Sequence, residues 1–60
     1  MKNPQYLGDA VYIHRDDLNR IVLTTGHHDP ADKYCTNVIV LEPEVLIAFT
    51  KYLEKMVAGT

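Results

Sequence analysis

The sequence contains one cysteine, Cys35, and no long apolar run. A single cysteine excludes a disulfide within the chain and a paired C-x-x-C metal or redox motif, and it favours a reducing compartment. No apolar stretch approaches the roughly 20 residues that a membrane span needs, and no run of signal-peptide length follows Lys2. These absences lead us to expect a cytoplasmic protein.

The chain also lacks a strong excess of either acidic or basic residues. The formal net charge is −2, and acidic and basic residues are mixed along the chain. Nucleic-acid-binding domains usually carry a basic stripe, whereas here Arg15 and Arg20 flank a turn that also holds Asp16 and Asp17. The pattern therefore favours an ordinary solvated surface over a nucleic-acid interface.

The length limits what the chain can stabilise. Sixty residues form one domain at most, 1–60, and the hydrophobic fraction of 47% is that of an ordinary folded domain. A core of this size usually needs help from disulfides, metal or oligomerisation. Because disulfides are excluded, the sequence favours a homo-oligomer.

The first two thirds of the chain read as strands and turns. We expect an N-terminal arm over 1–9, because Asn3 precedes Pro4 and Gly8-Asp9 is a turn signal. A β-meander follows over 10–42. Its three strands alternate and are rich in β-formers, and they cover 10–15, 20–25 and 37–42, with a polar loop at 26–36.

The last third predicts a helix over 43–58. Pro43 suits the first helical position, and Glu44 and Lys55 match the helix dipole at its two ends. Gly59 is a natural stop. The apolar stripe has helical spacing and consists of Val45, Phe49, Tyr52, Leu53 and Met56, widened by Leu46 and Val57.

These elements predict an α+β fold: a three-stranded antiparallel β-meander followed by one C-terminal amphipathic helix packed on one sheet face (βββα). Alternation assigns one face to the core, with Val11, Ile13, Ile21, Leu23, Ile39 and Leu41. The opposite face holds Tyr12, His14, Val22, Thr24, Val38 and Val40. That second face is unusually apolar for one that meets water, since one helix can cover only one side of the sheet.

The same alternation predicts the register of the first hairpin. If Ile13 and Ile21 share the core face, paired residue numbers must sum to an even number, as for Arg15 with Asn19. We therefore expect a loop of three or five residues, with Asn19 in the left-handed conformation.

Candidate chemistry is sparse. The 26–36 loop carries His27, His28, Asp32 and Cys35, but a zinc site needs three or four converging ligands, and adjacent histidines on an extended chain point apart. A Cys35 nucleophile would need a base and a charge-stabilising group beside it, in a chain with little room for a pocket. We expect no catalytic residues, no metal site and no cofactor.

Several segments together resemble a known family. The stretches YLGDAVY, IVLTT, TNVIVLEPEVL and FTKYLEKM, between Tyr6 and Leu53, are similar to very short phage and prophage proteins with the pattern Y-L-G-D-G-V-Y, L-T-T, T-N-x-I-x-L-E-P-x-V-L. Ala10 departs from the glycine of that pattern, and the 26–36 loop is longer. The resemblance implies a phage-encoded protein in a bacterial cytoplasm. Such small proteins include inhibitors of host defence, such as those acting on the Hachiman system.

From the residues and the resemblance we expect a non-enzymatic binding protein that acts stoichiometrically on a host protein and forms a homodimer. The side chains predicted to serve the partner or the dimer are Tyr12, Val22, Val38, Val40, Ile47, Tyr34, His27 and His28. Two alternatives stay open: a small nucleic-acid-binding regulator, and a metal- or small-ligand-binding module that uses the 26–36 loop.

Overall fold

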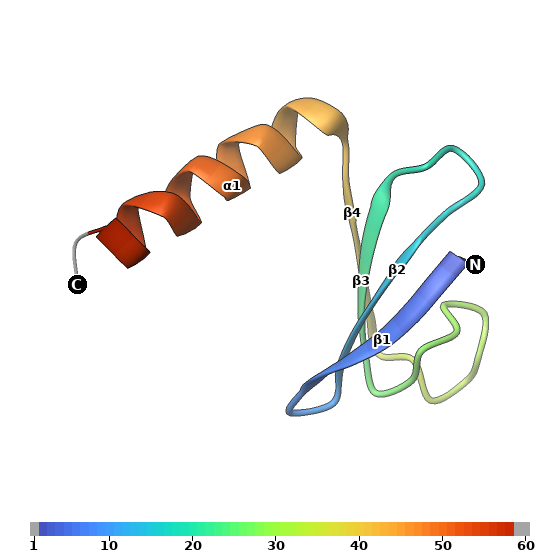
Figure 1. Ribbon diagram of the computed structural model, residues 1–60. Coiled ribbons are helices and arrows are strands. Elements are labelled where there is room, and N and C mark those ends of the chain that lie inside the picture. The colour runs from blue at the N-terminus through green and yellow to red at the C-terminus, as the bar shows by residue number, and fades with distance from the viewer. Residues whose placement is uncertain (1, 59–60) are drawn as a thin grey trace.

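A computed structural model describes residues 2–58 and shows a sheet followed by a helix (Figure 1). The strands are β1 (Lys2–Gly8), β2 (Val11–Arg15), β3 (Ile21–Thr25) and β4 (Asn37–Leu41), and the helix is α1 (Pro43–Ala58). The sheet is antiparallel, with its strands in the order of the sequence. The predicted α+β class is confirmed, and the sheet has one strand more than predicted.

The extra strand is β1, which the sequence predicted to be an arm. It pairs with β2, with Tyr6 opposite Tyr12, but its register shifts in two places and Asn3 has a φ of 51°. Pro4, which lacks a backbone N–H, lies in the first of these irregular stretches, between Lys2 and Gln5 on an edge strand. These irregularities remove the strict alternation by which a strand is recognised in a sequence.

A two-residue turn joins β1 to β2. Gly8 is opposite Val11, so Asp9 and Ala10 form the loop, with φ values of 50° and 62°. Positive φ at both central residues is the type I′ turn that matches the twist of a hairpin. Ala10 therefore occupies a left-handed position that glycine adopts at less cost. Its N–H donates to the Tyr6 hydroxyl at 3.2 Å.

The hairpin between β2 and β3 confirms the predicted parity. Ile13 is opposite Leu23 and Arg15 is opposite Ile21, which leaves a five-residue loop over 16–20. Asn19 has a φ of 63°, as predicted.

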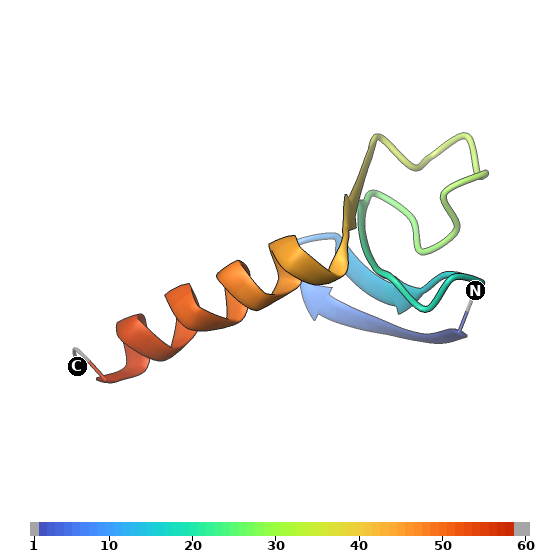
Figure 2. The same ribbon diagram turned by 90° about the horizontal axis from the view of Figure 1, so that it is seen from above.

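The bounds predicted for the helix are correct, but its predicted packing across a sheet face is wrong. Figures 1 and 2 show α1 projecting from the sheet, and it contacts mainly β4. No residue of α1 is buried, and Leu46 is its one half-buried residue. A single residue, Glu42, connects β4 to α1, so the helix cannot turn back freely over the strands.

Two ion pairs of Arg20, called here the ion-pair bridge, stabilise the connection between β4 and α1 at Glu42. Arg20 Nε lies 2.7 Å from Asp16 Oδ2, and a terminal guanidinium nitrogen lies 2.8 Å from Glu42 Oε1. The backbone N–H of Arg20 also donates to Asp16 Oδ1 at 2.8 Å. This backbone hydrogen bond is the main reason that the pKa of Asp16 lies below its ordinary value. The bridge ties the β2–β3 turn to the start of α1.

Burial on the sheet also differs from the prediction. The face predicted to be the core is only partly covered: Ile39 is 52% exposed and only Leu41 is buried, while the other four predicted core residues are half-buried. The opposite face holds the buried side chains Val22, Thr24 and His14. The 26–36 loop lies on that side of the sheet, away from α1 (Figure 2), and the Thr24 hydroxyl donates to the backbone oxygen of His27 at 2.8 Å. The polar 26–36 loop, and not α1, therefore covers the buried part of the sheet.

The resulting molecule is elongated. Its radius of gyration is 12.6 Å, against about 10 Å for a compact chain of this length. It exposes 4720 Å², against about 4000 Å² for a folded monomer of its mass. Within residues 2–58, no helix combines the length and apolar character needed to cross a membrane.

Candidate functional site

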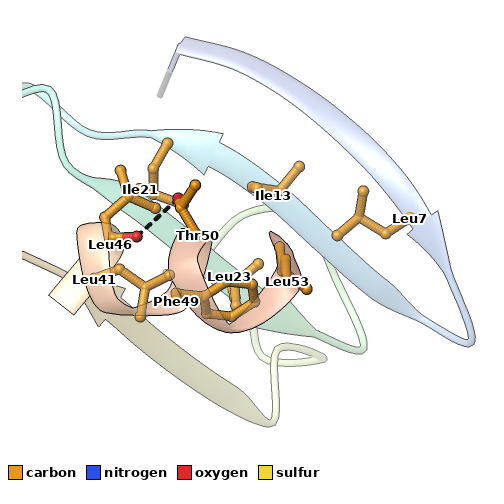
Figure 3. A pocket seen from close by; sticks show the side chains of 9 residues that line it. All are labelled: Leu7, Ile13, Ile21, Leu23, Leu41, Leu46, Phe49, Thr50 and Leu53. Atoms are coloured by element: carbon orange, nitrogen blue, oxygen red, sulfur yellow. Dashed lines mark hydrogen bonds between the residues drawn. The ribbon is translucent and has the colours of Figure 1, made fainter. Parts of the chain in front are cut away.

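The sheet has a hollowed surface on each of its two sides. The first, the α1–sheet groove, is an apolar groove of about 500 Å³ (Figure 3). Its one polar lining side chain is Thr50, whose hydroxyl donates to the Leu46 backbone oxygen at 2.9 Å. The lining residues are Leu7, Ile13, Ile21, Leu23, Leu41, Leu46, Phe49, Thr50 and Leu53.

The second surface is a row of aromatic rings, formed by Tyr6, Tyr12, His28 and His27 and called here the aromatic row. The ring centroids of Tyr6 and Tyr12 are 5.1 Å apart, and those of Tyr12 and His28 are 6.2 Å apart, with tilted planes. The two histidine rings stack at 4.3 Å. These separations are those of favourable aromatic contacts.

The aromatic row borders a shallow hollow of about 280 Å³, lined by Pro4, Gln5, Tyr6, Tyr12 and His28. Tyr6 is 62% exposed, so its ring offers apolar area to a partner. Tyrosine is enriched in interfaces because it contributes large contact area together with a hydroxyl that can donate a hydrogen bond. The hollow therefore presents exposed aromatic area on the face opposite the α1–sheet groove.

The backbone of the 26–36 loop positions the two histidines. Gly26 has a φ of 87°, and a Cβ there would collide with the backbone oxygen of Tyr34. Its N–H donates to the Ala10 backbone oxygen at 2.9 Å, which joins the loop to the β1–β2 turn. The Thr36 N–H donates to the Thr25 backbone oxygen at 2.9 Å and closes the loop. His27 and His28 are thereby brought beside β1 and β2.

The loop uses its polar groups internally. His27 Nδ1 accepts a hydrogen bond from the Asp29 N–H at 3.1 Å, and its Nε2 lies 3.7 Å from Asp32 Oδ2. The Cys35 thiol donates to the Asn37 backbone oxygen at 3.4 Å. Among residues 2–58, no group of three or more histidine, cysteine or acidic side chains is placed to hold a metal ion.

The residues predicted from the sequence to bind a partner are spread over several surfaces. Tyr12, His27 and His28 come together in the aromatic row, and Val38 and Val40 lie exposed on the same sheet face. The structure does not bring the remaining three to that surface: Val22 is buried at 3% exposure, Tyr34 lies exposed in the loop, and Ile47 is exposed on α1 outside the groove. Val22 is corrected to a core residue.

Tyr6 was absent from the predicted site residues. It joins the site only because β1 pairs with β2 and places it opposite Tyr12. Tyr6 and Tyr12 are six residues apart in YLGDAVY, and a regular two-residue hairpin pairs residues an odd number apart. They face each other only because the register shifts between Tyr6 and Gly8, so no simple spacing in the sequence would have found the pair.

His14 is a buried polar group next to this surface. Its side chain lies on the same face as Tyr12 and is 5% exposed, and its Nδ1 atom has no hydrogen-bond partner within the described residues. The sequence placed His14 on the outward face, and the structure buries the part of that face formed by His14, Val22 and Thr24.

No protein family model, curated protein or solved structure matches this chain.

Proposed function

We propose that this chain is a phage-encoded, non-enzymatic binding protein that acts stoichiometrically by covering the surface of a host protein, as an anti-defence inhibitor does. The single observation that carries the proposal is the aromatic row with its neighbouring hollow. The phage origin and the host-defence target rest on the resemblance of the YLGDAVY, IVLTT and TNVIVLEPEVL stretches.

The aromatic row fits a protein partner for two reasons. Exposed tyrosines form binding hot spots because they bury much area at little cost in side-chain freedom. Tyr6 is also held in place, since its hydroxyl accepts the hydrogen bond from the Ala10 N–H and its ring contacts Tyr12. A side chain that is ordered before binding loses less entropy when the partner arrives.

Capture of a host protein by the untagged chain, with identification by mass spectrometry, tests the proposal. We expect Tyr6→Ala and His28→Ala to lower the affinity for the captured protein at least about 30-fold, as truncation of a central interface residue does. Tyr52→Ala is the matched control, because Tyr52 is 67% exposed on α1, away from the aromatic row. It should retain the host protein.

Three results would contradict the proposal. One is turnover of a substrate at protein concentrations far below those of the target. Another is full binding by Tyr6→Ala together with loss of binding by Tyr52→Ala. The third is retention of nucleic acid instead of protein with a steep dependence on salt, which would favour a nucleic-acid-binding regulator.

A further inference from the structure

The apolar surface of α1 is wider than its own sheet covers. Leu46, Phe49 and Leu53 line the α1–sheet groove. Val45, Tyr52 and Met56, called here the outer stripe, are 50%, 67% and 56% exposed. Their i, i+7, i+11 spacing places them along one line of the helix. A single sheet face cannot cover both sets.

The exposed area matches what a dimer of ordinary size needs. The chain exposes 4720 Å², about 700 Å² more than a compact monomer of its mass is expected to expose. A stable two-protein interface buries about 800 Å² on each partner. The excess exposed area of this chain is therefore close to the area that one partner buries in such an interface.

The outer stripe and the α1–sheet groove form one continuous surface. Phe49 lines the groove, and it lies four residues after Val45 and three before Tyr52, so it borders the outer stripe on the helix surface. One occupant can therefore cover both. A helix about 24 Å long that projects from its sheet can lie along a second helix over most of its length (Figure 2).

We propose that the occupant is a second copy of this chain, with the two α1 helices lying side by side and antiparallel about a two-fold axis near their midpoints. A two-fold arrangement buries the same surface on both copies and closes the assembly. It also gives the chain the additional core that sixty residues lack.

Charge favours the antiparallel orientation. Glu44 is the one charged residue in the first half of α1, and the second half holds Lys51, Glu54 and Lys55, with a net positive charge. Antiparallel helices place the acidic start of one beside the basic half of the other, and their dipoles oppose favourably. Parallel helices would align like charges and like dipole ends.

This dimer goes beyond the proposed function and does not depend on it. The outer stripe belongs to α1 and the groove lies between α1 and the sheet (Figure 3). The aromatic row includes Tyr12, which lies on the opposite sheet face, and two histidines of the 26–36 loop. The sequence left the face of Tyr12 and Val22 open to either the dimer or a partner, and the dimer proposed here uses α1 instead. The Tyr6 variant should lose host binding and remain a dimer. Variants of the outer stripe should lose the dimer and still bind the host protein.

Sedimentation equilibrium of the untagged chain tests the dimer. We expect twice the 6.8 kDa of one chain at tens of micromolar, and Tyr52→Glu and Met56→Glu should raise the dimer dissociation constant at least about 30-fold. The matched control is Ile47→Glu, because Ile47 is 57% exposed on the same helix but outside both the groove and the outer stripe. It should sediment as the dimer.

Spin labels test the orientation. In a Cys35→Ser background, labels at Lys51→Cys lie near the helix midpoint and labels at Lys55→Cys lie toward its end. In an antiparallel pair, the two labels at position 55 are farther apart along the helix axis than those at position 51, by about 12 Å. A monomer at tens of micromolar, equal label separations at both positions, or loss of the dimer in Ile47→Glu but not in Tyr52→Glu would each overturn the proposal.

Discussion

Replacing Ala10 by glycine should stabilise the protein, although it removes a side-chain methyl group. Ala10 has a φ of 62° in the two-residue turn between β1 and β2. A residue with a Cβ pays about 1–2 kcal/mol in the left-handed region. Glycine avoids that cost. The greater conformational freedom of glycine in the unfolded chain offsets about 0.4–1 kcal/mol of the gain. From the middle of these two ranges, the net gain is about 0.8 kcal/mol.

The contacts of the turn do not oppose this gain. Ala10 is exposed, and both of its hydrogen bonds are made by backbone atoms: its N–H donates to the Tyr6 hydroxyl, and its carbonyl accepts from the Gly26 N–H. Glycine keeps both. Asp9 followed by glycine would also be a favoured pair for a type I′ turn.

Thermal unfolding followed by circular dichroism, at one fixed chain concentration, measures the effect. A gain of this size should raise the midpoint by several degrees in a domain of this length. The matched control is Ala48→Gly, because Ala48 is exposed within α1. There glycine should destabilise by about 1 kcal/mol. If both substitutions lower the midpoint equally, the reasoning from the left-handed turn is wrong.

Three further changes address the loop and the ion-pair bridge. Gly26→Ala should destabilise by about 2 kcal/mol or more in urea titration, because φ is 87° and the new Cβ meets the Tyr34 backbone oxygen. Thr24→Val should cost about 1–3 kcal/mol in the same assay, since the His27 oxygen loses its donor, whereas Thr24→Ser keeps it. Acid titration should separate the parent from Asp16→Asn. The folded pKa of Asp16 is lowered, so its contribution is complete above the ordinary carboxyl range near pH 4 and is lost as pH falls through the lower folded value. The parent should be the more stable at pH 7, and the two should converge in acid; a constant difference would contradict this account.

The sequence was sufficient for the local elements of the fold. The helix bounds were predicted because Pro43 and the 3.6-residue apolar spacing are local signals, and α1 covers Pro43–Ala58. The parity of the first hairpin followed from alternation, which fixes the face of each side chain once a strand is recognised. The left-handed Asn19 followed from the turn chemistry of its neighbours.

Only the tertiary structure could decide what those elements cover. β1 is irregular, so its place in the sheet depends on backbone pairing with β2, which leaves no periodic signal. The direction of α1 depends on a one-residue link at Glu42 and on an Arg20 bridge that spans 22 residues of sequence. The aromatic row needs β1, β2 and the 26–36 loop to meet in space. Periodicity identifies which side chains share a face, but long-range contacts determine which face is buried and which stays open to a partner.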